Sequence, residues 1–347
     1  MFDLATLLRN NIRNIKPYSS ARDEYSGADG VFLDANENPF GSVAEGDFNR
    51  YPDPYQRAVK EKLAALKNVE VEQIFLGNGS DEPIDLLFRA FARPGKDNVI
   101  IMPPTYGMYQ VCADINDVEV RKVSLTADFE IREKEVLDAV DENTKLIFVC
   151  SPNNPTGNLL SGEKIEYLLN SFSGLVVVDE AYIDFADAES WSTKLNEYPN
   201  LLVLQTFSKA WGMAALRIGM AFASDEIISI FNKIKYPYNL NVLTQQKALE
   251  ALDNVAKKDA FVAQILEQRA YLIHAFESMN VENIYPSDSN SLLIKVAGAH
   301  EVYNALVKKL IIVRDRSSVT LCNDCLRITI GTQEENDLLI EELKGLL

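Results

Sequence analysis

The segment Leu146-Ile-Phe-Val-Cys150-Ser-Pro-Asn-Asn-Pro-Thr-Gly157 begins with five consecutive apolar residues and continues into a turn that contains two prolines. An apolar run of this length is typical of a strand that is buried on both faces of a sheet. Similar runs occur along the chain at 99–102, 175–178, 201–204 and 218–222. Helical patterns lie among them, including those at 83–91 and 164–169. The alternation predicts an α/β fold with a mostly parallel central sheet flanked by helices.

The pattern changes after about Asn241. Longer helical stretches at 245–252 and 261–276 are followed by shorter strands at 291–296 and 326–330, which predicts a second, smaller α+β domain. We therefore expect a large domain at residues 31–240 and a small domain formed by residues 1–30 and 241–347. A short amphipathic helix at the N-terminus is expected to pack with the small domain.

Composition excludes several classes of partner. The chain has 347 residues, of which 47% are hydrophobic and 24% charged, so it is long enough for a full core. Its net charge of -17 argues against nucleic acid, which is bound by clustered Lys and Arg. No secretory signal and no run of about 18 apolar residues is present, so no membrane segment is expected. Scattered cysteines and the acidic balance favour the cytoplasm.

The four cysteines include one Cys-x-x-Cys pair, Cys322 and Cys325. One pair without further Cys or His partners cannot complete a tetrahedral zinc site, so no metal is expected. A redox switch and simple packing are the two interpretations of this pair, and packing is favoured. The two histidines, His274 and His300, are not expected to be catalytic.

Polar residues follow the predicted strands, where ligands of parallel sheets bind. The turn after residue 150 presents the amide of Asn154, and Asp179 and Tyr182 follow the run at 175–178. A carboxylate at the end of a buried strand requires a cation or strong hydrogen-bond donors. Either an arginine of the protein or a ligand can supply that cation for Asp179.

The segment Thr206-Phe-Ser-Lys-Ala-Trp-Gly-Met-Ala-Ala-Leu-Arg217 places Lys209 among apolar residues and near a second cation. Both features lower the pKa of a lysine and so favour a nucleophilic amine. The guanidinium of Arg217 can bind a phosphate through its planar fork. The alternative interpretation is an amphipathic stretch with a surface lysine.

Two further turns could contribute to the same site. Gly77-Asn-Gly-Ser-Asp-Glu-Pro-Ile84 opens a helix, whose free N–H groups at Ser80 and Asp81 could bind an anion. A solvated helix cap is the alternative, because the carboxylates of Asp81 and Glu82 can satisfy the same dipole. Tyr106 could stack on a flat ring, or it could be an ordinary turn residue.

These residues together describe one ligand. Ser80 and Arg217 would bind a phosphate, Asp179 an aromatic nitrogen cation, Asn154 and Tyr182 a phenolate oxygen, and Lys209 an aldehyde. Pyridoxal 5'-phosphate carries these four groups.

The ordered set Asn154-Pro-Thr-Gly157, Asp179 with Tyr182, Ser208-Lys209 and Arg217 resembles the fold-type I pyridoxal-phosphate aminotransferases over nearly the whole chain. Among them, the histidinol-phosphate aminotransferases are the most similar. That resemblance rests on Lys16-Pro-Tyr-Ser-Ser-Ala-Arg22, Ala35-Asn-Glu-Asn-Pro39, Arg50-Tyr-Pro-Asp-Pro54 and Cys325-Leu-Arg-Ile-Thr-Ile-Gly331.

The resemblance implies a role for each matching residue. Lys209 would bind the cofactor covalently and act as the base, Asp179 would keep the pyridine nitrogen protonated, and Asn154 and Tyr182 would bind the ring oxygen. The phosphate would be held by Ser80, Asp81, Thr206, Ser208 and Arg217. Tyr51 would reach the cofactor phosphate of the neighbouring subunit, which implies a homodimer. Substrate would meet Tyr18, Asn36, Arg314 and Arg327.

The implied reaction is a transamination between L-histidinol phosphate and 2-oxoglutarate, in histidine biosynthesis. Arg314 and Arg327 could each bind a substrate anion or pair with an acidic residue of the protein. A threonine-phosphate decarboxylase and an aromatic amino-acid aminotransferase are alternatives that would use the same cofactor residues. A cofactor-sensing regulator is disfavoured, because the chain leaves no room for a DNA-binding module before its first substrate-side residues.

Overall fold

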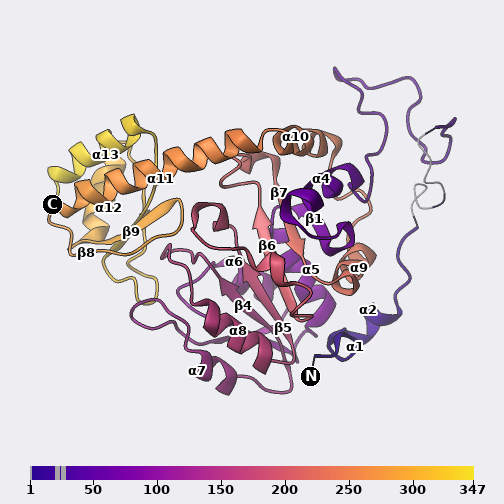
Figure 1. Ribbon diagram of the computed structural model, residues 1–347, viewed down its shortest axis with the longest axis horizontal. Helices are drawn as coiled ribbons and strands as arrows, with labels where there is room; N and C mark the ends of the chain where they lie inside the picture. Colours follow the sequence, from indigo (N-terminus) through magenta and orange to yellow (C-terminus); the bar gives the residue numbers. More distant parts are fainter. Residues whose placement is uncertain (1, 20–23, 25–28) are drawn as a thin grey trace.

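A seven-stranded sheet forms the centre of the computed structural model, which describes residues 2–19, 24 and 29–347 (Figure 1). Its strands, in the spatial order β1-β7-β6-β5-β4-β2-β3, are β1 (Ile74–Asn78), β7 (Ile218–Phe222), β6 (Leu201–Thr206), β5 (Leu175–Asp179), β4 (Thr144–Cys150), β2 (Asn98–Ile101) and β3 (Glu119–Lys122). Strand β7 is antiparallel to both of its neighbours, and the pairs from β6 to β3 are parallel. The predicted, mostly parallel sheet is confirmed.

Both faces of this sheet are buried, which explains the unbroken apolar runs. Along β4, Leu146, Phe148 and Cys150 pack into one core, and Ile147 and Val149 pack into the other. The first core is completed by α5 (Asp81–Phe91), α6 (Met108–Ile115) and α9 (Asp225–Ile234). The second is completed by α4 (Arg57–Lys67), α7 (Glu133–Asp138), α8 (Gly162–Ser171) and α10 (Val242–Leu252). Successive residues of a strand point to opposite faces, so the central strands, which are covered on both faces, are apolar along most of their length. The edge strand β3 is not buried, and its sequence is mostly charged.

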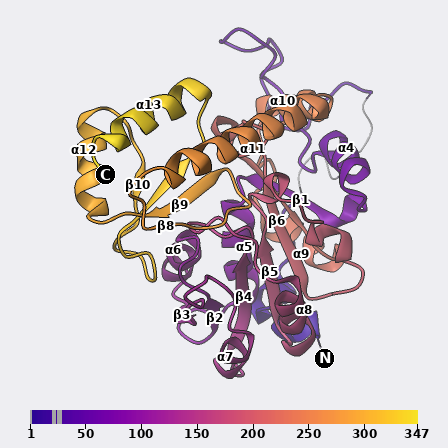
Figure 2. The same cartoon turned by 60° about the vertical axis from the view of Figure 1, so that its left-hand side comes forward.

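The smaller domain has an antiparallel sheet in the order β10-β11-β9-β8. Its strands are β8 (Asn283–Ile284), β9 (Ser291–Lys295), β10 (Arg314–Asp315) and β11 (Cys325–Thr329). The C-terminal half of α11 (Val255–Glu277), together with α12 (Ala299–Lys308) and α13 (Gln333–Lys344), packs on it. Helix α11 extends from the large domain to the smaller one (Figures 1 and 2). Within the described part of the chain, no helix combines the length and the apolar character needed to cross a membrane.

The structure differs from the predicted domain division in two places. The N-terminal helices α1 (Leu4–Leu7) and α2 (Asn10–Asn14) lie on the large domain: Leu7 packs into the core of α5, and the Arg9 N–H donates to the Ala90 carbonyl at 3.0 Å. Helix α10 packs on α4 in the large domain. Periodicity in a sequence reveals that a helix has an apolar face, but it does not reveal which surface covers that face.

Four short 3-10 helices complete the described elements. They are η1 (Val71–Gln73), η2 (Ile183–Phe185), η3 (Trp191–Lys194) and η4 (Ala214–Leu216). The last of these lies between Lys209 and Arg217, so the segment quoted above is a compact turn rather than a regular helix. This turn brings the two cations back to one side of the sheet.

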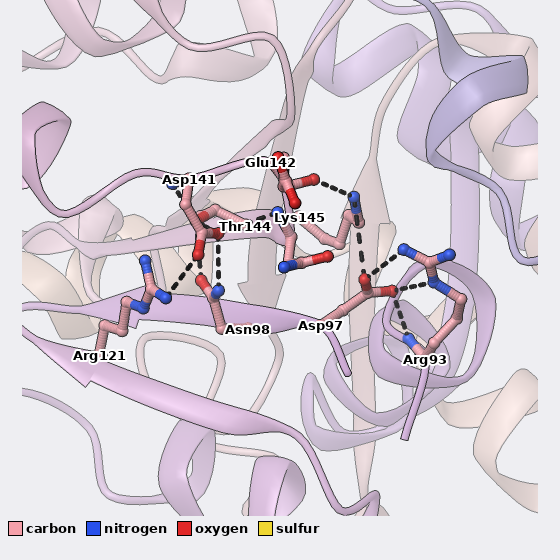
Figure 3. A network of polar contacts seen from close by, with 9 residues as sticks. Arg93, Asp97, Asn98, Arg121, Asp141, Glu142, Thr144 and Lys145 are labelled. Carbon is pink, nitrogen blue, oxygen red and sulfur yellow. Dashed lines mark hydrogen bonds and ion pairs between the residues drawn. The ribbon is translucent and has the colours of Figure 1, made fainter. Parts of the chain in front are cut away.

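A polar network ties the amino ends of β2 and β4 together (Figure 3). The Asp97 carboxylate accepts hydrogen bonds from Arg93 Nη2 at 2.6 Å and Nε at 2.8 Å, and Lys145 Nζ lies 3.9 Å away. Beside it, Asp141 accepts from Arg121 Nη2 at 2.6 Å and from Asn98 Nδ2 at 2.9 Å. Burial raises the pKa of Asp97, but the hydrogen bonds from Arg93 outweigh it and leave that pKa below its ordinary value.

We expect Asp97→Ala to lower the free energy of unfolding by about 2–3 kcal/mol, because it leaves the buried Lys145 ammonium without its carboxylate. The loss should be seen by urea unfolding at pH 7. The pKa of Asp97 is depressed in the folded state. The difference in free energy of unfolding between the wild type and Asp97→Ala should therefore be complete above the unfolded pKa of about 3.9 and should disappear as pH falls further. Lys247→Ala, which removes an exposed pair with Glu250, is the control and should change stability by less than about 0.5 kcal/mol. Equal stability of Asp97→Ala and the control would contradict the assignment.

Candidate functional site

A cavity of about 680 Å³ opens at the carboxyl ends of β4, β5 and β6, and β10 and β11 of the smaller domain border its other side. Its lining contains most of the residues that the sequence singled out: Ser80, Asp81, Tyr106, Asn154, Asp179, Tyr182, Thr206, Ser208, Lys209, Arg217, Arg314 and Arg327. Cys150 and Arg316, which were not predicted, line it too. Side chains from both domains therefore meet in one space.

Asp179 is the last residue of β5 and is buried at 2% exposure. Its Oδ2 accepts a hydrogen bond from the Tyr109 hydroxyl at 2.7 Å, and its Oδ1 accepts one from the Ala181 N–H at 3.1 Å. Burial raises the pKa of Asp179 to about 6, although both hydrogen bonds oppose this shift. Among the described residues no Arg or Lys forms an ion pair with it, so the carboxylate remains available to a cationic ligand in the cavity.

Tyr109 was missed by the sequence interpretation. It lies on α6, it is completely buried, and its ring stacks on Phe148 with centroids 4.6 Å apart. Its hydrogen-bond partner is 70 positions away in the chain, so no local signal could have connected the two residues. The contact fixes the orientation of the Asp179 carboxylate from the side away from solvent.

Lys209 projects into the cavity beside Tyr182, with Nζ 5.4 Å from the centre of the tyrosine ring. Burial lowers the pKa of Lys209, and the charges of Arg327 and Arg217 lower it further, while Asp179 acts in the opposite direction. This environment favours the neutral amine, which is the nucleophilic form. The tyrosine itself is a weaker acid than usual, because burial raises the pKa of Tyr182 to about 12.

An anion site lies at the turn between β1 and α5. Ser80 precedes the helix and its side chain does not cap it, and the N–H groups of Ser80 and Asp81 make no hydrogen bond to any other described residue. Asp81 does not cap the helix either: its carboxylate accepts from the Tyr106 hydroxyl at 3.0 Å and lies 3.3 Å from Arg217 Nη2. The structure therefore favours the anion site over the solvated cap.

The backbone around this turn is closely packed. A Cβ placed on Gly219 of β7 would come within 2.2 Å of the Ser80 nitrogen, so a side chain there would displace the turn. Arg217 itself adopts a left-handed conformation, with φ of 52°, which turns its side chain toward Asp81. Nearby, Thr206 Oγ1 accepts from the Ser208 N–H at 3.1 Å, so the two hydroxyls lie together at the end of β6.

Arg314 and Arg327 are directly opposite each other in the β10–β11 ladder, so both side chains project from the same face of the sheet. Arg327 Nη1 donates to Asn154 Oδ1 at 2.5 Å, a contact between the two domains. Neither arginine forms an ion pair with a carboxylate of the described residues. The alternative of a structural salt bridge is thus not found for either of them.

Three predicted residues lie elsewhere. Tyr18 is 74% exposed, and Asn36 and Tyr51 line a second hollow of about 600 Å³. The ring of Tyr51 stacks on Tyr238, with centroids 4.4 Å apart. Arg22, at the end of the N-terminal motif, lies outside the described residues. One chain by itself does not bring these side chains to the cavity.

The model of the family "Aminotransferase class I and II" matches residues 28–343. The chain belongs to this family. A histidinol-phosphate aminotransferase of Cytophaga hutchinsonii is 59% identical to this aminotransferase over 99% of both chains. One from Flavobacterium johnsoniae is 54% identical over 99% of this chain and 98% of its own length. The family predicted from the sequence is confirmed.

Solved structures agree on the fold. The histidinol-phosphate aminotransferase of Sinorhizobium meliloti, in complex with pyridoxal-5'-phosphate, superimposes with a TM-score of 0.78 at 24% identity over 90% of each chain. The L-threonine-O-3-phosphate decarboxylase of Porphyromonas gingivalis gives a TM-score of 0.72 at 24% identity, over 86% of this chain and 91% of its own. The fold of this aminotransferase is therefore shared by enzymes that cleave different bonds.

The residues of this aminotransferase fit pyridoxal phosphate. The N–H groups of Ser80 and Asp81, which have no partner among the described residues, suit its phosphate together with Arg217. The buried Asp179, which forms no ion pair within the described part of the chain, suits its ring nitrogen. Lys209 lines the same cavity, and its amine suits the aldehyde. No other group in the described cavity offers a comparable amine.

Proposed function

We propose that this aminotransferase uses pyridoxal phosphate to transfer the amino group of L-histidinol phosphate to 2-oxoglutarate, which yields imidazole acetol phosphate and L-glutamate for histidine biosynthesis. The observation that carries the proposal is the cavity with Lys209 and Asp179 on one side and, on the other, Arg314 and Arg327, which pair with no carboxylate of the described residues. The name carried by relatives that are 51–59% identical over the whole chain supports the choice of donor.

Each part of the cavity has a chemical task in this proposal. Bound pyridoxal phosphate supplies an aldehyde that captures amines and a ring that withdraws electrons. Asp179 keeps the ring nitrogen protonated, which strengthens that withdrawal. Lys209 Nζ would take the proton from the carbon that bears the donor amine and would deliver it to the carbon that carried the cofactor's aldehyde group. The N–H groups of Ser80 and Asp81, together with Arg217, Thr206 and Ser208, anchor the cofactor phosphate.

Asn154 has two tasks. In the structure its Oδ1 accepts a hydrogen bond from Arg327. Its Nδ2 would donate a hydrogen bond to the ring oxygen of the cofactor, and the Tyr182 hydroxyl would do the same. We propose that Asn154 thereby couples the position of the substrate arginine to that of the cofactor ring. Arg327 and Arg314 would bind the substrate phosphate or the carboxylates of 2-oxoglutarate.

The test is a transamination assay on the purified protein with L-histidinol phosphate and 2-oxoglutarate, with glutamate measured as product. L-phenylalanine and O-phospho-L-threonine are the competing donors. Release of carbon dioxide from O-phospho-L-threonine without an acceptor would favour the decarboxylase, and faster turnover of phenylalanine would favour the aromatic aminotransferase. Failure of L-histidinol phosphate to convert the bound cofactor in a half-reaction would reject the proposal.

We further propose that the protein is a homodimer. Residues 29–52 form an arm that stands away from the helices and sheets of the chain (Figures 1 and 2). Val31, Leu33, Phe40 and Val43 on this arm are each at least 86% exposed, which is unusual for apolar side chains so close together. A second copy of the chain would cover them and would receive Tyr51 near its cofactor phosphate.

Light scattering in solution is expected to give a mass twice 38.9 kDa. Tyr51→Phe should keep this mass but weaken cofactor binding about tenfold, because one hydrogen bond to a charged phosphate is lost. Tyr167→Phe, on the outer face of α8, is the control and should bind the cofactor like the wild type. A monomer, or unchanged cofactor affinity in Tyr51→Phe, would contradict the dimer-shared site.

The cytoplasm is the compartment we propose. All four cysteines, Cys112, Cys150, Cys322 and Cys325, are buried free thiols. Reduced thiols are typical of proteins that work in a reducing compartment.

A further inference from the structure

A third arginine, Arg316, faces the same cavity as Arg314 and Arg327. It follows β10, and its N–H continues the ladder by donating to the Cys325 carbonyl at 2.8 Å. Arg314 pairs with Arg327 in this ladder, and residues two positions apart on a strand share a face. The register therefore gathers three guanidinium groups on one side of two short strands.

No carboxylate of the described residues forms an ion pair with any of these three arginines. The intervening Asp315 has its side chain engaged elsewhere: its Oδ2 lies 2.8 Å from His300 Nδ1, and its Oδ1 accepts from the Ser317 hydroxyl at 2.6 Å. Arg327 is bound to an uncharged amide, that of Asn154. Three like charges in one partly buried place repel one another, so an anion must compensate them when the site is in use.

The side chain of Arg316 also has an unused donor. Its Nε is buried and has no hydrogen-bond partner among the described residues, although the cavity is open to the rest of the guanidinium. A buried donor of a charged group that lacks a partner costs free energy in the free protein. Arg316 lines the cavity, where its terminal N–H groups could donate to a phosphate.

We propose that Arg316 binds the phosphate of the amino donor together with Arg314 and Arg327, and that it makes the site selective for a phosphomonoester dianion over a carboxylate monoanion. A phosphomonoester carries close to two negative charges at neutral pH and three acceptor oxygens, whereas one carboxylate offers a single charge and two oxygens. Among amino donors, a dianion therefore compensates more of the charge of three guanidinium groups than a single carboxylate does. The inference rests on the proposed function and adds to it a residue that determines donor specificity.

The experiment compares L-histidinol phosphate with L-histidinol, the same donor without the phosphate, in holoenzyme of the wild type, Arg316→Gln and Arg316→Lys. We expect Arg316→Gln to lower kcat/KM for the phosphorylated donor by 10- to 100-fold, mainly by raising KM, and to change kcat/KM for L-histidinol by less than 3-fold. Arg316→Lys keeps the charge without the planar fork and should lose less. Arg89→Gln, at the outer end of α5, is the matched control and should behave as wild type.

Inhibition by inorganic phosphate provides a second readout that does not depend on the donor. Because bound cofactor fills the site at Ser80 and Arg217 in the holoenzyme, added phosphate should compete at the three arginines. Its inhibition constant should rise at least 10-fold in Arg316→Gln. Equal losses with L-histidinol phosphate and L-histidinol, or an unchanged inhibition constant, would overturn the role of Arg316. If wild-type enzyme fails with L-histidinol phosphate, the proposed function fails, while the phosphate inhibition still decides whether Arg316 binds a phosphate.

Discussion

Replacing Lys209 with Ala is expected to slow the half-reaction with L-histidinol phosphate by about 10⁴-fold or more, because no other amine in the described cavity can move the proton at the donor carbon. The same change should abolish covalent cofactor capture. Stopped-flow absorbance of the bound cofactor measures the first effect, and mass spectrometry after borohydride reduction measures the second.

Lys257→Ala is the matched control for this experiment. Lys257 lies on α11, outside the cavity, with Nζ 5.6 Å from the Phe261 ring. Its loss should leave the half-reaction within about 2-fold of the wild type, as is usual for surface substitutions. If Lys209→Ala retains covalent cofactor or turnover near that of the control, its assigned role is wrong. A methylamine rescue of Lys209→Ala would support its role as base, since the added amine can occupy the emptied space.

Asp179→Asn should reduce kcat by about 10³-fold, because an amide cannot hold the ring nitrogen in its protonated, electron-withdrawing form. Tyr109 and Ala181 bond different oxygens of Asp179, so the single Asn carbonyl can keep the bond from the Ala181 N–H while the Asn Nδ2 donates to the Tyr109 hydroxyl, and the fold around β5 is expected to stay intact. Steady-state kinetics at saturating cofactor measures the loss and separates it from weaker cofactor binding.

The same substitution should stabilise the protein when no cofactor is bound. Asp179 has a folded pKa of about 6, raised by burial, against about 3.9 when unfolded. The stabilisation from its protonated form is therefore complete below pH 3.9 and is lost as pH rises through about 6. At pH 8 the buried charge costs roughly 2–3 kcal/mol, which the uncharged Asn avoids. Urea unfolding of cofactor-free protein at pH 8 should show Asp179→Asn to be the more stable of the two.

Glu180→Gln provides a matched control, because Glu180 is equally buried and burial raises its pKa to about 7. Its carboxylate accepts from Ser190, Trp191 and Gln205 and does not line the cavity. This variant should therefore keep kcat within about 3-fold. A large loss of kcat in Glu180→Gln, or a less stable Asp179→Asn at pH 8, would argue against the assignment of Asp179 as the partner of the ring nitrogen.

The strand ends were predictable from the sequence for a physical reason. An apolar run marks a strand buried on both faces, and parallel strands end at a common edge, so Asn154 and Asp179 had to lie near each other. Lys209 and Arg217 were predictable because they lie within one turn of the chain, where local spacing determines which side chains meet.

The contacts of Tyr109 and of Arg327 were not predictable in this way. The Tyr109 hydroxyl meets Asp179 across 70 positions, and Arg327 meets Asn154 across 173. Similarly, Arg316 could be recognised only once the ladder register placed it beside Arg314. The packing of α10 on α4 also required the structure, since the apolar face of α10 has no sequence signal for its partner.

The sequence by itself determined the class of fold, the family and the residues that could hold a phosphate, a ring nitrogen and an aldehyde. These follow from apolar periodicity and from motifs within short segments, which are local properties of the chain. Only the tertiary structure decided that Asp179 has no arginine partner among the described residues and that Tyr109 orients it. It also decided that three arginines, none paired with a carboxylate in the described part of the chain, face one cavity. Burial, register and charge balance depend on segments brought together by folding, so they appear only when the two domains are in place.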